Sequence, residues 1–203
     1  SSSSRGLGDV YKRQVQANNS TNSVTTEIEA EGTRGAVGTR TNHDFVIKTN
    51  QTERMRIDAN GRVTKPLQPS FSVGKSAIQN NIGVSSYDTI TFDTEVFDVG
   101  SNFASNTFTA PVTGKYHLTL NLRLDNVDTA ASYYNIGINT SNRSYYQLFQ
   151  PNHPSDVAYY VQTMTLIADM DANDTANCSV NQHNGTSQTD INTTTVFMGI
   201  LIG

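Results

Sequence analysis

The sequence is poor in cysteine, in long apolar runs and in positive charge. With Cys178 as its single cysteine, the chain cannot form an intrachain disulfide, so its fold does not require an oxidising compartment. No apolar run reaches membrane-spanning length and no signal-peptide core is visible, so we expect no membrane insertion. The net charge is −4 and no basic run follows the first residues, so we expect no nucleic-acid partner.

Apolar residues are also scarce. They make up 35% of the 203 residues, and Asn, Thr and Ser form much of the remainder. Such a chain has a modest core and a large uncharged polar surface, as strand-rich fibrous or oligomeric proteins do. Its length suits one sizeable domain with an extension, or two small domains.

The clearest pattern that is present is an alternation of apolar and polar residues. The apolar positions are Tyr116, Leu118, Leu120, Leu122 and Leu124, and the polar positions between them are His117, Thr119, Asn121 and Arg123. A period of two over nine residues predicts a strand with one face in a core and the other face outside it. Pro111 and Gly114 break the chain just before it, so a short strand around Phe108 turns into the long one.

Four pieces of sequence, in order, resemble the C1q/TNF-like domain. Phe108, Pro111, Gly114 and Tyr116 match its signature of an aromatic residue, Pro, Gly and Tyr leading into an alternating strand. The other pieces resemble its first strand, the strand pair before the signature and its closing strand: Pro69–Val73, Thr91–Thr94 and Val196–Ile202. The resemblance implies an all-β fold, with a jelly-roll sandwich over residues 69–203 that assembles as a homotrimer.

Residues 15–63 show short strand patterns without helical periodicity. Phe45 and Ile47 alternate with polar or outward neighbours, as do Met55 and Ile57. The dipeptide Asn60-Gly61 predicts a tight turn, because both residues can take a positive φ. Strands this short bury little surface within one chain, whereas three chains interleaved around an axis would each supply a wall.

A second resemblance covers Thr41–Val63. Its extended strand, the run Thr-Glu-Arg-Met-Arg-Ile-Asp, the Gly turn and the final Val look like a module of bacteriophage tail-fibre shafts. The resemblance implies a trimeric β-fibre segment over residues 15–65, joined to the head by a linker at residues 66–68. Before it, Ser1–Gln14 resembles an adapter-derived translation found at the ends of proteins from environmental sequence. We exclude that segment from the fold.

Candidate chemistry is sparse. The histidines (His43, His117, His153 and His183) have no partners at metal-ligand or nucleophile spacing, and Cys178 alternates with Ala176 and Val180 as a buried thiol would. We therefore expect no enzymatic activity.

The candidate metal ligands are Asp169, Asp171 and Asn173, whose side-chain oxygens stand at alternate positions as in calcium loops. An EF-hand needs Gly where Asp174 stands and Glu where Val180 stands, and an Asx-rich turn between strands has the same composition. Some C1q-like trimers carry calcium near their apex. Calcium is thus the one cofactor that the sequence leaves open.

The predicted subunit interface lies on the polar face of the alternating strand. In the C1q/TNF-like family this strand belongs to the sheet nearest the threefold axis, which places His117, Thr119 and Asn121 towards neighbouring subunits. One residue of the pair Tyr159 and Tyr160 should join them. Adjacent tyrosines in a strand point to opposite faces, so one member of each pair contacts the core and the other a subunit or a receptor.

Together the resemblances predict a virion tail-fibre component whose distal head binds a glycan or protein of the host cell surface. Its other partners would be its own copies and neighbouring tail proteins. Two alternatives remain. In the first, the head is a purely structural trimerisation cap. In the second, the protein is a polysaccharide depolymerase, although the long β-helix repeats of such enzymes are not visible.

Overall fold

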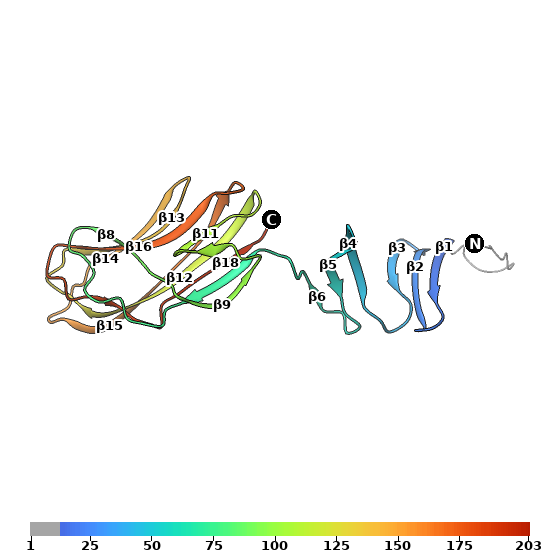
Figure 1. Cartoon of the computed structure of the whole chain (residues 1–203), viewed down its shortest axis with the longest axis horizontal. Coiled ribbons are helices and arrows are strands. Elements are labelled where there is room, and N and C mark those ends of the chain that lie inside the picture. The colour runs from blue at the N-terminus through green and yellow to red at the C-terminus, as the bar shows by residue number, and fades with distance from the viewer. Residues whose placement is uncertain (1–12) are drawn as a thin grey trace. The chain divides into compact units, whose positions relative to one another are not determined.

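The computed structural model describes residues 13–203, all of it strands and connections, and no helix in this part of the chain could span a membrane. The adapter-like interpretation of residues 1–12 lies outside the described residues. The first strand begins at Arg13, so it includes the last two residues of the segment that we excluded. The chain divides into two compact units between Leu67 and Gln68 (Figure 1).

The first unit consists of two three-stranded antiparallel meanders. The strands of the first sheet are β1 (Arg13–Asn19), β2 (Val24–Glu31) and β3 (Arg34–Thr39). Those of the second are β4 (Phe45–Thr49), β5 (Thr52–Ile57) and β6 (Val63–Thr64). Wherever the structure describes the burial of this unit's residues, none is fully buried. A single copy of the unit therefore has no closed core.

The turn between β5 and β6 lies where Asn60-Gly61 predicts it, but its conformation differs. Gly61 has a φ of +83°, whereas Asn60 is not among the residues with positive φ. The carboxylate of Asp58 explains the difference, because one of its oxygens accepts hydrogen bonds from the backbone N–H groups of Asn60 and Arg62, both at 2.9 Å. This side-chain acceptor holds a wider loop than a two-residue turn.

The second unit is a sandwich of two antiparallel sheets packed face to face (Figure 1). The β12 sheet has the order β15-β12-β18-β7-β9, with β17 also paired to β12. Its strands are β7 (Ser70–Gly74), β9 (Thr94–Val99), β12 (Gly114–Val127), β15 (Val157–Met170), β17 (Asp190–Ile191) and β18 (Val196–Leu201).

The β13 sheet has the order β10-β11-β16-β13-β14, with β8 also paired to β16. Its strands are β8 (Tyr87–Thr89), β10 (Phe103–Ala104), β11 (Thr107–Thr109), β13 (Tyr133–Thr140), β14 (Ser144–Phe149) and β16 (Thr175–His183). The all-β jelly-roll prediction is confirmed.

The core between the two sheets follows the predicted alternation. The five apolar residues Tyr116, Leu118, Leu120, Leu122 and Leu124 of β12 are fully buried. They face buried residues of the β13 sheet, including Ile136, Ile138, Cys178 and Val180. Phe71 of β7 joins the two layers, since its ring lies 4.6 Å from that of Phe108 and 5.0 Å from that of Phe197.

One segment that we expected to be strand is a loop. Residues 91–93 have no strand pairing, and β9 begins only at Thr94. The reason is local: Phe92 is buried and its backbone N–H donates to Asn106, while the Asp93 carboxylate accepts hydrogen bonds from the backbone and hydroxyl of Ser76. These side-chain contacts, together with one backbone hydrogen bond from Asp93 to the carbonyl of Gly74, take the place of a regular ladder.

Replacing Leu120 with Ala should destabilise the second unit by about 2–5 kcal/mol, because the side chain is fully buried and the cavity cannot collapse completely. Thermal or chemical unfolding measures the change. Val112→Ala serves as the control, since Val112 is exposed and its loss should change stability by no more than about 0.5 kcal/mol. An unchanged unfolding midpoint for Leu120→Ala would mean that the register of β12 is wrong.

Candidate functional site

The outward face of the β12 sheet carries the three polar residues that the sequence predicts there. His117 Nε2 and Thr119 Oγ1 lie 2.8 and 2.9 Å from the hydroxyl of Thr165 on β15. The hydroxyl of Thr163 donates to Asn121 Oδ1 at 3.1 Å. The two strands thus share a polar strip whose side chains are already positioned by cross-strand hydrogen bonds.

Exposed apolar side chains flank this strip on the same face. Register places Ile167 and Ile200 opposite His117, on either side of it, and Met198 opposite Thr119. Further along lie Val161 of β15 and Phe97 of β9, and all five side chains are exposed. A broad apolar surface around a polar strip is typical of a face that another protein covers.

Tyr159 and Tyr160 separate onto opposite faces of β15. Tyr159 lies opposite Asp125 and is 64% exposed, and the Arg123 guanidinium lies 5.2 Å from its ring centroid. Tyr160 instead stacks on Phe149 at 4.4 Å, on the core side. Tyr159 is therefore the residue of the pair that shares the outward face, and Tyr160 does not lie on it.

The other two tyrosine pairs divide in the same way. Tyr134 is fully buried, whereas Tyr133 stacks on His183 at 4.6 Å on the outward face of the β13 sheet. Tyr145 packs against the core, whereas Tyr146 is 46% exposed. In each pair, one tyrosine thus packs in the core and the other lies on the surface.

The calcium candidate spans the end of β15, which holds Asp169, and the turn to β16, which holds Asp171 and Asn173. Asp169 lies 3.5 Å from the ammonium of Lys115, and Asp171 Oδ1 lies 3.4 Å from the Thr113 hydroxyl. Asn173 takes a φ of +76°, the conformation that Asn tolerates in place of Gly. No group of three acidic, His or Cys residues suited to a metal ion occurs within residues 13–203.

Asp174 organises this turn. Its carboxylate accepts hydrogen bonds from the Ser141 hydroxyl at 2.7 Å, the Asn142 amide at 2.6 Å and the backbone N–H of Asp171 at 2.7 Å. The Ser141 hydrogen bond and the Asp171 backbone lower the pKa of this carboxyl. The arrangement matches the Asx-stabilised turn that was the alternative to a calcium loop.

The remaining candidate residues lie apart. His43 is in the first unit, where Nδ1 lies 3.0 Å from the Thr41 hydroxyl, and His153 is exposed in the loop before β15. Cys178 is completely buried in the core, and burial raises the pKa of its thiol. Its environment is that of an apolar core residue.

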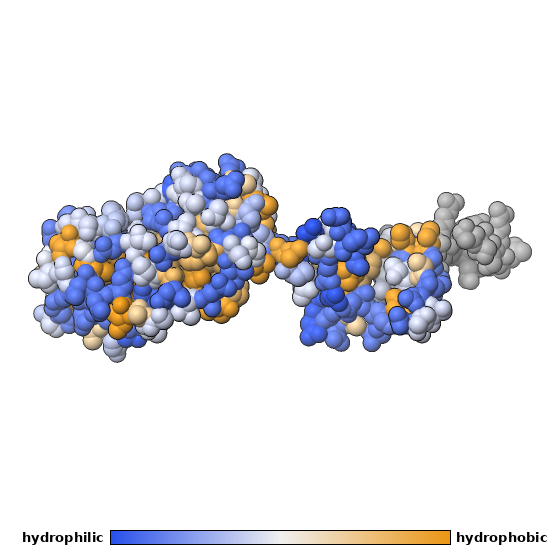
Figure 2. Space-filling view, in the orientation of Figure 1, coloured by the Kyte–Doolittle hydropathy of each residue, from blue (hydrophilic) through white to orange (hydrophobic). Residues whose placement is uncertain are grey.

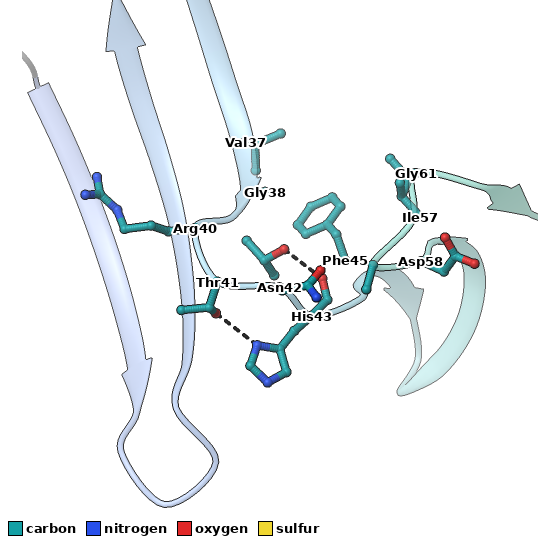
Figure 3. A pocket seen from close by; sticks show the side chains of 12 residues that line it. Val37, Gly38, Arg40, Thr41, Asn42, His43, Phe45, Ile57, Asp58 and Gly61 are labelled. Atoms are coloured by element: carbon teal, nitrogen blue, oxygen red, sulfur yellow. Dashed lines mark hydrogen bonds between the residues drawn. The ribbon is translucent and has the colours of Figure 1, made fainter.

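An open hollow of about 470 Å³ lies within the first unit, where residues between β3 and β6 surround it (Figure 3). Val37, Phe45 and Ile57 supply apolar side chains, and the hydroxyl of Thr39 donates to the carbonyl of His43 at 2.8 Å. Apolar side chains elsewhere in this unit are also exposed, and Figure 2 shows apolar patches on its visible face. They include Val15, Ile28, Ile47 and Val63.

Two packed antiparallel sheets, with a long central strand that presents a polar strip and an apolar surround, define a jelly-roll domain of the C1q/TNF class. The C1q domain model matches residues 70–202, so the chain belongs to the C1q domain family. C1q domains are typically trimeric and act in binding or trimerisation rather than in catalysis. Self-association of this chain is consistent with that behaviour.

Among solved structures, the globular domain of zebrafish complement 1qA protein is 17% identical with a TM-score of 0.48, over 67% of this chain and 98% of that chain. Two crystal structures of murine APRIL, at pH 8.0 and 8.5, are 10% identical with TM-scores of 0.49 and 0.48. Each match covers 66% of this chain and 99% of that chain. A comparison with curated protein sequences finds no match.

Cys178 should resist a soluble thiol reagent in the native protein, because it is buried and its raised pKa disfavours the reactive thiolate. The same reagent should modify one thiol per chain in denaturant. Absorbance of the released chromophore measures both reactions. Rapid stoichiometric labelling under native conditions would contradict the placement of β16 in the core.

Proposed function

We propose that the chain is the distal part of a trimeric bacteriophage tail fibre, with residues 15–65 as shaft and residues 69–203 as a head that contacts the host cell surface. One observation carries the proposal. The same chain holds a C1q domain and a strand unit in which no described residue is fully buried. The resemblance of Thr41–Val63 to a fibre-shaft module supports the same function.

The first unit supports the trimeric shaft because its apolar side chains have nothing to cover them within one copy. Val15 is 70% exposed, and Ile28 and Val37 are each 59% exposed. The open hollow beside Phe45 would receive side chains from neighbouring copies. Three chains around an axis would bury this surface and so supply the packed apolar face that a small sheet needs for stability in water.

In the proposed trimer, three copies of the head would each present a binding surface to the host cell. The apolar residues around His117 supply a face for subunit contact, which leaves the β13 sheet to face outward. Three weak sites held on one fibre bind a surface with high avidity. The partners in this proposal are a host glycan or protein and other tail proteins, and the location is the virion.

A second candidate is a trimerisation cap that registers the shaft and binds no receptor. The exposed apolar residues of the β12 sheet favour it, since subunit association alone accounts for them. Binding of the labelled full chain to a panel of bacterial cells distinguishes the two functions. Saturable binding to one host group supports the adhesin, and absence of binding by a verified trimer supports the cap.

The full chain should sediment as a stable trimer at micromolar concentration, because both units expose apolar surface that only other copies would cover. Sedimentation velocity measures the species present. A chain shortened to residues 15–67 should not remain trimeric with the same stability, since it lacks the face of the β12 sheet. A folded monomer of the full chain would contradict the assembly.

A further inference from the structure

The outward face of the β13 sheet has a composition that subunit contact through the β12 sheet does not explain. Register aligns Asn135 of β13 with Asn181 of β16, and Asn181 with Tyr87 of β8. On β14, Tyr146 lies opposite Gly137, which in turn lies opposite Ser179. We call the surface formed by Tyr87, Asn135, Tyr146, Ser179 and Asn181 the amide–tyrosine face.

The floor of this face is polar and buried. Asn135, Ser179 and Asn181 are each at least nine-tenths buried although they point away from the core. The amide nitrogen of Asn135 donates to the Tyr87 hydroxyl at 2.6 Å, but its Oδ1 has no hydrogen-bond partner. A buried amide oxygen without a partner costs free energy, and a hydrogen bond from a bound molecule would remove that cost.

Aromatic rings stand above this floor. The rings of Tyr87 and Tyr146 lie 5.7 Å apart and are 53% and 46% exposed. Gly137 makes room for one of them, because a Cβ there would lie 3.0 Å from the Tyr146 ring and 2.9 Å from the Ser179 hydroxyl. Partial desolvation and the neighbouring Tyr146 raise the pKa of Tyr87, so its hydroxyl remains a neutral donor.

The absence of charged side chains restricts which ligands this face can bind. The outward positions of β8, β13, β14 and β16 carry no Lys, Arg, Asp or Glu. A phosphate polymer, an acidic lipid surface or a charged peptide would leave its charges unpaired there. Flat rings beside fixed amides instead suit a neutral sugar, whose C–H faces pack on aromatic rings while its hydroxyls bond to the amides.

We propose that the amide–tyrosine face binds a neutral carbohydrate, with Tyr87 and Tyr146 as the platforms on which a sugar ring stacks and Asn135 as a hydrogen-bonding residue. The inference rests on the adhesive function proposed above and names its site and ligand class. Three copies of the face in one trimer would convert weak single-site affinity into firm attachment.

The test uses the full chain on an array of neutral and acidic oligosaccharides, followed by calorimetric titration of the best neutral one. Tyr146→Ala should weaken the titrated affinity by about tenfold or more, since it removes a stacking platform. Tyr146→Phe keeps the ring and should stay within about threefold of wild type. Val112→Ala is the control, because Val112 is as exposed as Tyr146 but lies in the loop before β12 and belongs to neither face, and this variant should bind as wild type does.

Binding of neutral sugars that only Tyr146→Ala weakens supports the inference. Absence of neutral-sugar binding, binding of acidic sugars alone, or an unchanged affinity in Tyr146→Ala overturns it, provided that circular dichroism shows the variant folded. If that variant unfolds, Tyr87→Ala replaces it under the same criteria. Sedimentation of each sample separates the two proposals, because a trimer without sugar binding contradicts only this site, whereas a monomeric wild type contradicts the proposed fibre.

Discussion

The alternation of β12 is the constraint on which the second unit depends. This strand lies inside its sheet, between β15 and β18, so both of its edges are paired. Five consecutive inward positions are fully buried, which commits His117, Thr119 and Asn121 to the opposite face. A slip of one residue would exchange the two sets and expose the leucines. Core packing therefore also determines which side chains are available to a neighbouring subunit.

The β13 sheet differs from the β12 sheet, because side chains cover both faces of its central strands. Ile136 and Ile138 face the core, while Asn135 on the other side lies beneath tyrosine rings. A polar residue covered in this way makes few contacts with water, so its hydrogen bonds must come from the protein or from a ligand. The polar strip of the β12 sheet is instead partly exposed to solvent, as the residues of a protein–protein interface are in a free subunit.

The sequence predicted what depends on neighbours along the chain. Alternation alone gives the register of β12, the buried position of Cys178 and the division of each tyrosine pair. It could not give the burial of Asn135, because the covering residue Tyr87 is 48 positions away. Likewise the turn at Asn60-Gly61 was located correctly, but the dipeptide could not show that the Asp58 carboxylate accepts the hydrogen bonds that shape it.

The two units also differ in how much burial each achieves within one copy of the chain, and this difference explains how the proposed fibre would assemble. The head has a closed core of leucines and phenylalanines, so it can reach a defined fold before assembly. The first unit has no fully buried residue among those described, so in the proposed fibre its strands would gain burial when copies meet. A head that trimerises first would hold three shaft segments at high local concentration and in register. In that arrangement the face of the β12 sheet sets the symmetry, and the amide–tyrosine face remains free for a ligand.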